Sequence, residues 1–194
     1  MRVEIFDHME QCTEAEVQRM LPMVSEQRRQ QAMRYKHTFG QFSCLKSWLM
    51  LQELMANGEW TNGEWKYNEH GKPYIEGGPY FSISHCKEGI AVAIDDQPIG
   101  IDIEAIRPAK EDLIERVMNE EERLQITGYG LPDRMFTRLW TQKEAVVKAQ
   151  GVGIRSFEQV QTILEESGKW KVESVEKEKY IYSIAYGKLC SISA

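Results

Sequence analysis

The sequence lacks the long apolar runs and the cysteine pairs that mark several large classes of protein. No stretch approaches the ~20 apolar residues needed to cross a bilayer, and the first residues, MRVEIFDHMEQ, carry acids where a secretory signal has an apolar run. The four cysteines form no CxxC pair, and they stand at Cys12, Cys44, Cys86 and Cys190. We therefore expect reduced thiols in a cytoplasmic protein that does not bind membranes.

Positive charge and histidine are also scarce. The chain has 24 Lys and Arg against 30 Asp and Glu, which gives a formal net charge of −6, and it has only 4 His. Proteins that bind nucleic acids usually present a basic face, so we expect no nucleic-acid partner. A local basic pocket for a phosphorylated ligand is still compatible with this charge.

Several nucleotide and catalytic motifs are absent. The chain has no GxxxxGK[ST] loop, no GxGxxG after a strand, no GxSxG and no HExxH. These absences argue against a P-loop nucleotide hydrolase, a dinucleotide-binding enzyme, an α/β-hydrolase and a zinc protease of the common type.

What is present predicts an α+β protein of two lobes, because helical patterns and groups of alternating strands follow one another twice. The 194 residues, 42% of them hydrophobic, suffice for two small cores. We place the lobes at residues 1–97 and 98–194. We expect helices at 25–40, with a break at Gly40, and at 41–58, 119–126 and 132–150. We expect strands at 2–6, 64–76, 79–86, 89–94 and 99–105, and two or three more within 169–193.

One strand carries two acids on the same face. In QPIGIDIEAIRP (97–108), Ile99, Ile101 and Ile103 alternate with polar positions, and the turn DDQP (95–98) predicts a hairpin with the strand before it. Asp102 and Glu104 then lie ~7 Å apart and point the same way. Such a pair either faces solvent or shares a cation, for which Mg²⁺ or Mn²⁺ suits an all-oxygen donor set.

A helix block, WTQKEAVVKAQG, supplies a third acid together with cations. Glu144 and Lys148 stand four residues apart on one face, with Trp140 one turn earlier and Lys143 beside them. The simplest interpretation is a surface ion pair worth a few tenths of a kcal/mol. The tryptophan on the same face favours a face that is at least partly covered.

Upstream residues add groups that can bind phosphate. His85 ends the strand FSISH, with Ser84 on the opposite face, and Lys72 stands in the turn GKP. Arg28 lies near the start of a helix, where the helix dipole favours acids instead. Each of these residues alone is more often structural than functional.

The three blocks FSISH, IGIDIE and LWTQKEAVVKAQG, in this order and after GKP, resemble the signature blocks of the 4′-phosphopantetheinyl transferases. The surfactin-synthetase-activating type is the most similar, and the segment SEQRRQQAMRYKH resembles its N-terminal helix. The likeness covers roughly residues 25–157. Gln31 and Ser43 depart from it, because that group has basic residues there.

The resemblance implies an enzyme of the holo-(acyl-carrier-protein) synthase kind. Such enzymes move the phosphopantetheine arm of coenzyme A to a serine of an apo acyl or peptidyl carrier protein, with Mg²⁺, and release adenosine 3′,5′-bisphosphate. The implied fold is a pseudo-dimer of two similar lobes, each a small antiparallel sheet with a long helix, and the active site lies in the cleft between them. We expect a monomer, since such a chain supplies both halves of the cleft.

The resemblance also implies roles by matched position. Asp102, Glu104 and Glu144 would bind the metal, and Glu144 or a metal-bound water would take the proton of the serine. Lys148 would neutralise charge on the leaving phosphate. The positions implied to hold coenzyme A are Arg28, Lys72, Ser84, His85, Lys143 and Lys148.

Two other functions remain open at this point. A metal-dependent phosphodiesterase or pyrophosphatase would use the same acids to hydrolyse coenzyme A, although such enzymes usually carry more ligands for two metals. A non-catalytic relative would bind coenzyme A or a carrier protein without turnover, which the departures at Gln31 and Ser43 would suit.

A transferase also needs a basic surface to dock an acidic carrier protein. The candidates for this surface are Arg107, Lys110, Arg116 and Arg123.

Overall fold

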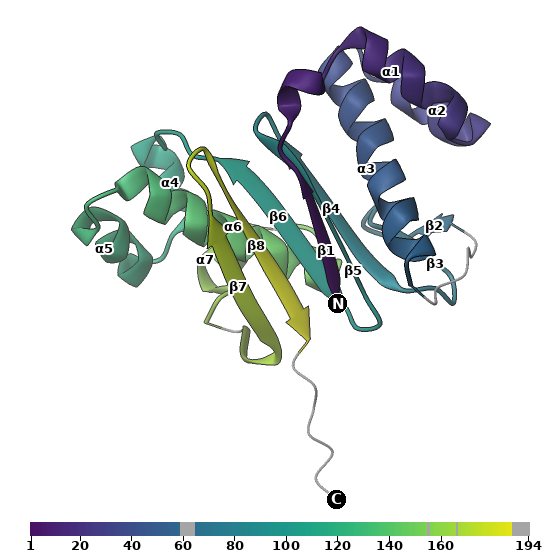
Figure 1. Ribbon diagram of the computed structural model, residues 1–194. Coiled ribbons are helices and arrows are strands. Elements are labelled where there is room, and N and C mark those ends of the chain that lie inside the picture. Colours follow the sequence, from purple (N-terminus) through teal and green to yellow (C-terminus); the bar gives the residue numbers. More distant parts are fainter. Residues whose placement is uncertain (59–64, 155, 166, 188–194) are drawn as a thin grey trace, which may run out of the picture.

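The computed structural model of the chain describes residues 1–58, 65–154, 156–165 and 167–187. Two three-stranded antiparallel sheets lie side by side, and the helices cover their outer sides (Figure 1). Helices α1 to α3 lie on the side of the N-terminal sheet, and α4 to α7 lie on the side of the C-terminal sheet. The predicted α+β class is confirmed.

The first half of the chain forms one sheet and its long helix. The sheet has the strand order β1 (Arg2–Phe6), β5 (Gly89–Asp95), β4 (Tyr80–Cys86). Helix α3 (Thr38–Ala56) packs on β5, and its apolar side chains form the largest buried cluster together with those of the sheet. The smaller elements are α1 (Glu14–Met20), α2 (Glu26–Met33), the 3-10 turns η1 (Met9–Gln11) and η2 (Leu21–Met23), and the ribbon of β2 (Trp65–Tyr67) and β3 (Pro73–Ile75).

The second half repeats this composition. Its sheet has the order β6 (Ile99–Ala105), β8 (Tyr180–Gly187), β7 (Trp170–Glu176), and the long helix α6 (Pro132–Gln150) packs across β6 and β8. The other elements are α4 (Glu111–Val117), α5 (Glu120–Gly128), α7 (Phe157–Thr162) and η3 (Ser167–Lys169). Each sheet draws its strands from one side of the boundary placed between residues 97 and 98. The two-fold relation between lobes and the domain division stay predictions.

Local signals for the ends of helices are confirmed. The Ser25 hydroxyl accepts from the backbone N–H of Arg28 at the start of α2. Asn119 and Glu122 form the reciprocal capping box of α5. Gly151 ends α6 at φ 73°, a left-handed backbone that glycine adopts without a steric cost.

Two predicted features are wrong. The strand 99–105 does not form a hairpin with β5, because β5 is the central strand of its sheet and both its edges are paired with β1 and β4. Gly40 does not break a helix. It lies inside α3, and a Cβ there would stand 2.7 Å from the ring of Tyr35, so the glycine leaves room for that ring.

Strand β6 is covered on both faces, which decides the environment of its acids. Ile99, Ile101 and Ile103 are fully buried in the cluster between the two sheets. The opposite face lies against α6 so closely that a Cβ on Gly100 would stand 1.9 Å from the carbonyl oxygen of Ala145. Asp102, on this second face, is only 3% exposed.

Within the described ranges no helix is both long and apolar enough to span a membrane. Cys12 is half-buried, and Cys44 and Cys86 are buried, and all three carry free thiols. Cys190 lies outside the described residues.

Candidate active site

Six of the nine predicted site residues gather where β4 of one sheet meets β6 of the other, beside α6. A cavity of about 360 Å³ lies there. Strand β4 lines it with Ser84 and His85, β6 with its two acids, and α6 with Trp140, Glu144 and Lys148. Residues from three separate parts of the chain thus face one space.

A compact triangle of polar groups forms the floor of this cavity. The Lys148 ammonium donates to Asp102 Oδ1 at 2.7 Å and to Ser84 Oγ at 2.9 Å, and the Ser84 hydroxyl donates to Asp102 Oδ1 at 2.7 Å. The triangle links β4, β6 and α6. Ser84 and Asp102 are buried and Lys148 is half-buried. Charge-assisted bonds of this kind fix side-chain positions more firmly than contacts exposed to water.

A second serine of β4, Ser82, makes a hydrogen bond to the edge strand β6 where the backbone of β6 has no neighbouring strand. The backbone N–H of Ile101 donates to Ser82 Oγ at 3.0 Å. Because β6 is an edge strand, this hydroxyl satisfies a backbone donor that would otherwise be buried without a partner. The alternation of FSISH therefore places two serines on the face that meets β6.

The other two carboxyls lie in the same partly buried space. Burial, followed by the charge of Asp102, raises the pKa of Glu144 from 4.5 to about 7. The same two causes raise the pKa of Glu104, while Arg107, Lys148 and the hydrogen bond from Trp140 act in the opposite direction. Three acids without enough positive charge between them favour a cation or a proton here.

The donor chemistry of this site fits a hard divalent cation. Asp102 Oδ2 is a buried oxygen with no hydrogen-bond partner, and Glu104 and Glu144 line the same cavity. Oxygen-only donor sets suit Mg²⁺ and Mn²⁺, which keep several water ligands. Among the described residues, no three His, Cys, Asp or Glu side chains are arranged to hold a metal ion by themselves. Such an ion would therefore depend on water or on a ligand for further oxygens.

Lys72 joins the turn between β2 and β3 to the last turn of α6. Its ammonium donates to the carbonyl oxygens of Lys148 and, at 3.4 Å, of Ile99. A lysine at a helix C-terminus also stabilises the helix dipole. Burial, followed by the charge of Lys148, lowers the pKa of Lys72 to about 8. Lys72 is thus a docked residue and not a solvent-facing turn lysine.

Asn68 belongs to this turn, and the sequence interpretation missed it. Its amide donates to the Gly151 carbonyl oxygen at 2.8 Å, and its Oδ1 accepts from the backbone N–H groups of His70 and Lys72. An asparagine two residues before HG is a typical signal of an Asx turn. The docking of that turn on α6 has no sequence signal.

A second cavity of about 440 Å³ adjoins the first at Ile83, Glu144 and Lys148. The turn 70–73, Phe81, Ser82 and the end of α6 line it. Its charged lining residues are Lys72, Glu144 and Lys148, and apolar side chains such as Phe81 and Val147 line the rest.

His85 and Arg28 lie at different distances from this centre. His85 is exposed to solvent at the first cavity, and its ring stands edge-on to Phe39 with centroids 5.6 Å apart. Partial desolvation, followed by the charge of Lys148, lowers its pKa. Arg28 instead lies over the Trp48 ring, 3.8 Å from its centroid, and touches Cys44 Sγ. Within the part of the chain that the structure describes, no hydrogen bond or ion pair joins Arg28 to the three acids.

Lys143 lies away from the site. It is 1% exposed, and its ammonium pairs with Glu122 at 2.8 Å on the side of α6 that faces α5 and α7. Neighbouring residues of a helix point about 100° apart, so the position next to Glu144 faces another element. We therefore do not propose Lys143 as a contact to coenzyme A.

The family of this chain is shown by its similarity to a protein from Aneurinibacillus migulanus named 4′-phosphopantetheinyl transferase gsp. It is 30% identical over 159 residues, which are 75% of this chain and 67% of the relative. The chain belongs to the 4′-phosphopantetheinyl transferase superfamily. The profile of that superfamily matches residues 98–188.

Other 4′-phosphopantetheinyl transferases are similar to this chain as well. A 4′-phosphopantetheinyl transferase of Bacillus subtilis is 31% identical over 147 residues, 72% of this chain and 65% of the relative. The AcpT transferase of Salmonella typhi is 34% identical over 113 residues, 54% of this chain and 58% of the relative. The chain thus spans about two thirds of the length of the first two relatives. The profile match includes the acids of β6 and the site residues of α6.

Proposed function

We propose that this protein transfers the 4′-phosphopantetheine arm of coenzyme A to a serine of an apo carrier protein and releases adenosine 3′,5′-bisphosphate. The observation that carries the proposal is the triangle of Ser84, Asp102 and Lys148, with two further acids beside it. It supplies a cation and a hydroxyl for a phosphate beside carboxylates that suit Mg²⁺. Membership of the superfamily supports the same reaction.

The transfer exchanges one P–O bond for another. The serine oxygen forms a bond to the phosphorus that carries pantetheine, and the bond from that phosphorus to the bridging oxygen breaks. The bond electrons leave with adenosine 3′,5′-bisphosphate. Lys148, the group that the triangle holds firmly, neutralises charge that builds on the phosphates.

Glu144 is the base that takes the serine proton in this proposal. Without a metal ion, burial raises its pKa to about 7. A carboxylate beside the serine hydroxyl is a suitable acceptor for its proton. Asp102, through its unpartnered Oδ2, Glu104 and Glu144 would hold Mg²⁺. The ion, when bound, polarises the phosphoryl oxygens and offsets their charge.

In this proposal coenzyme A binds with its nucleotide in the 440 Å³ cavity and its pyrophosphate at the triangle of Ser84, Asp102 and Lys148. Lys72 and the turn 70–73 line that cavity, and Ser84 and His85 lie beside the pyrophosphate. Arg28 is kept as a contact for the 3′-phosphate, at the outer end of a stack in which Trp48, Trp65 and Phe81 follow one another.

The carrier protein is placed on the other side of Glu104. A cavity of about 380 Å³ there is lined by Arg107 and Lys110 and by the apolar side chains of Leu113, Phe136 and Trp140. Basic and apolar groups together suit an acidic protein partner. We also propose that the protein is of the surfactin-synthetase-activating type. It would act as a monomer, because one chain supplies both walls of the cleft.

Intact-mass measurement of an apo carrier protein, after incubation with this protein, coenzyme A and Mg²⁺, tests the proposal. Carrier proteins of fatty acid, polyketide and peptide synthesis are each tried. We expect a gain of one phosphopantetheine arm, which EDTA and the Asp102→Ala variant abolish. Breakdown of coenzyme A without modification of a carrier would point to the phosphodiesterase. Binding without either product would point to a non-catalytic relative.

A further inference from the structure

Lys143 is a buried cation whose hydrogen-bonding capacity is fully used away from the active site. Its ammonium donates to Glu122 Oε1 at 2.8 Å, to the Val160 carbonyl oxygen at 2.6 Å and to the Gln161 carbonyl oxygen at 3.1 Å. An ammonium has three donors, so each has an acceptor. One acceptor belongs to α5 and two belong to α7, and Lys143 therefore ties both helices to α6.

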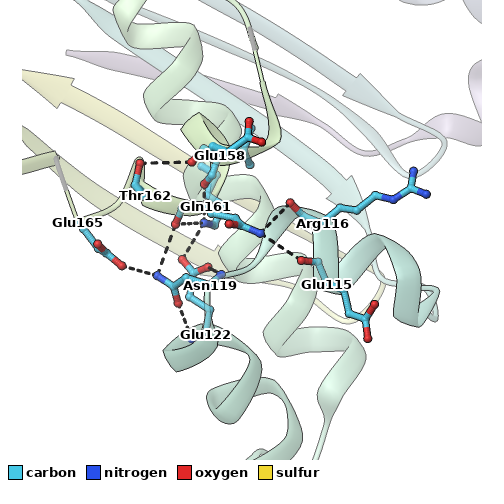
Figure 2. Close-up of polar contacts among 10 residues, drawn as sticks. Glu115, Arg116, Asn119, Glu122, Glu158, Gln161, Thr162 and Glu165 are labelled. Carbon is cyan, nitrogen blue, oxygen red and sulfur yellow. Dashed lines mark hydrogen bonds and ion pairs between the residues drawn. The ribbon is translucent and has the colours of Figure 1, made fainter.

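The same contacts continue into α4. The Gln161 side chain donates to the carbonyl oxygens of Glu115 and Arg116 at 3.1 and 3.2 Å, in the last turn of α4 (Figure 2). Asn119, which caps α5, donates to Glu165 beyond α7 at 2.6 Å. One continuous set of polar contacts thus runs from Lys143 through α7 to the end of α4.

Glu122 has two functions in this set. Its Oε2 accepts from the backbone N–H of Asn119 at 2.8 Å and closes the capping box of α5, while Oε1 accepts from Lys143. Glu122 is buried, so removal of the lysine would leave its charge without a counter-charge. A glutamine here would keep the capping box without the charge.

The position of α4 decides the shape of the cavity beside Glu104. Lys110, the N-cap of α4, and Leu113 in its first turn form one wall, and Phe136 and Trp140 of α6 form the other. Leu113 is 39% exposed, so this wall is open to solvent and to a partner. A shift of α4 relative to α6 would change this cavity and leave the triangle at Asp102 unchanged.

We propose that Lys143 is a positioning residue, which holds α4 through Glu122 and α7 at the separation from α6 that the acceptor protein requires. The inference rests on the proposed function, because it assigns the cavity beside Glu104 to the acceptor. It concerns recognition of the acceptor and not the chemistry at phosphorus.

Three variants test this role. Lys143→Met leaves Glu122 unpaired, the double variant Lys143→Met/Glu122→Gln removes both charges but keeps the capping box, and Lys171→Met removes an exposed lysine paired with Glu173 as a control. We measure the melting temperature and kcat, with KM for both the carrier protein and coenzyme A. The melting temperature should fall in the single variant, recover largely in the double variant and stay unchanged in the control.

The expected signature is a split between the two Michaelis constants. KM for the carrier protein should rise about 5-fold or more in both Lys143 variants, while kcat and KM for coenzyme A stay within about 2-fold. A double variant with recovered melting temperature and an unchanged KM for the carrier would overturn the proposal. An equal rise of both Michaelis constants would overturn it as well.

Amide hydrogen exchange separates this inference from the proposed function. Residues 113–118 should exchange faster in both Lys143 variants than in the wild-type protein and the control, and unchanged exchange would contradict the proposal. If the wild-type protein modifies no carrier protein, the proposed function fails. The exchange of α4 then still decides whether Lys143 holds this helix.

Discussion

The ammonium of Lys148 lies 2.7 Å from Asp102 Oδ1, and the two groups come from α6 and β6. Because Ser84 of β4 joins the same carboxylate oxygen, one side of Asp102 is saturated with donors. Its other oxygen is buried and has no partner. The carboxylate thus has one oxygen fixed by protein donors and one oxygen without a protein partner.

Substitution Asp102→Asn should remove activity and leave the fold intact. An asparagine of the same shape keeps the packing, but it provides no charge for Lys148 or for a metal ion. We expect the transfer rate to fall at least about 100-fold, as measured by intact mass of the carrier protein. Circular dichroism and the melting curve report the fold.

Glu14→Gln, in the exposed first turn of α1, is the matched control and should leave the rate unchanged. A variant with more than about a tenth of the wild-type rate would contradict the assigned role.

The raised pKa of Glu144 predicts a pH-dependent stability. In the folded protein this carboxyl keeps its proton up to about pH 7, whereas in the unfolded chain it loses the proton near its ordinary value of 4.5. Between these values the folded state binds more protons, so its stability decreases as the pH rises, and the loss is complete above about pH 7. Glu144→Gln stays neutral and avoids this loss. The variant should gain in melting temperature over the wild type at pH 8 relative to pH 5, in buffer without divalent ions. Equal differences at the two pH values would show that burial does not raise this pKa.

Addition of Mg²⁺ should stabilise the wild-type protein in the absence of coenzyme A. A ligand that binds only the folded state adds about 1.4 kcal/mol at ten times its dissociation constant. We expect a rise in melting temperature at pH 8 that saturates with Mg²⁺ and that EDTA reverses. In Asp102→Asn the rise should disappear, because the unpartnered Oδ2 is replaced. The same rise in both proteins would place the ion elsewhere.

Gly100→Ala should separate α6 from β6. The added methyl group would stand 1.9 Å from the Ala145 carbonyl oxygen and 2.4 Å from the Ala149 amide nitrogen, both of which are backbone atoms. Overpacking of this kind typically costs about 1–3 kcal/mol, and more where backbone must move. Denaturant unfolding measures the loss, with Gly130→Ala as a control, since a Cβ there meets no atom within 4 Å. A Gly100→Ala variant as stable as the control would mean that the helix and the strand lie further apart.

Features set by neighbouring residues could be predicted from the sequence. The spacing of Glu144 and Lys148 placed both on one helix face, and the alternation in IGIDIE placed both acids on one strand face. The capping box at Asn119 and the helix end at Gly151 were equally local. Each depends on a geometric repeat or a single backbone conformation, which a short segment determines by itself.

The partner of each surface was decided only by the tertiary structure. Sequence alternation showed that β6 has an apolar face, but it did not show that β1 and β4 exclude it from pairing with β5, or that α6 buries its acids. Lys143 and Lys72 were both expected to hold coenzyme A. The ammonium of Lys143 is instead bound to α5 and α7, and that of Lys72 is bound to the end of α6. Such pairings join segments far apart in the chain, and burial and charge select them only when the whole core forms. The sequence by itself thus determined which groups share a face, and the packing of the two sheets and α6 determined which of those faces became a site.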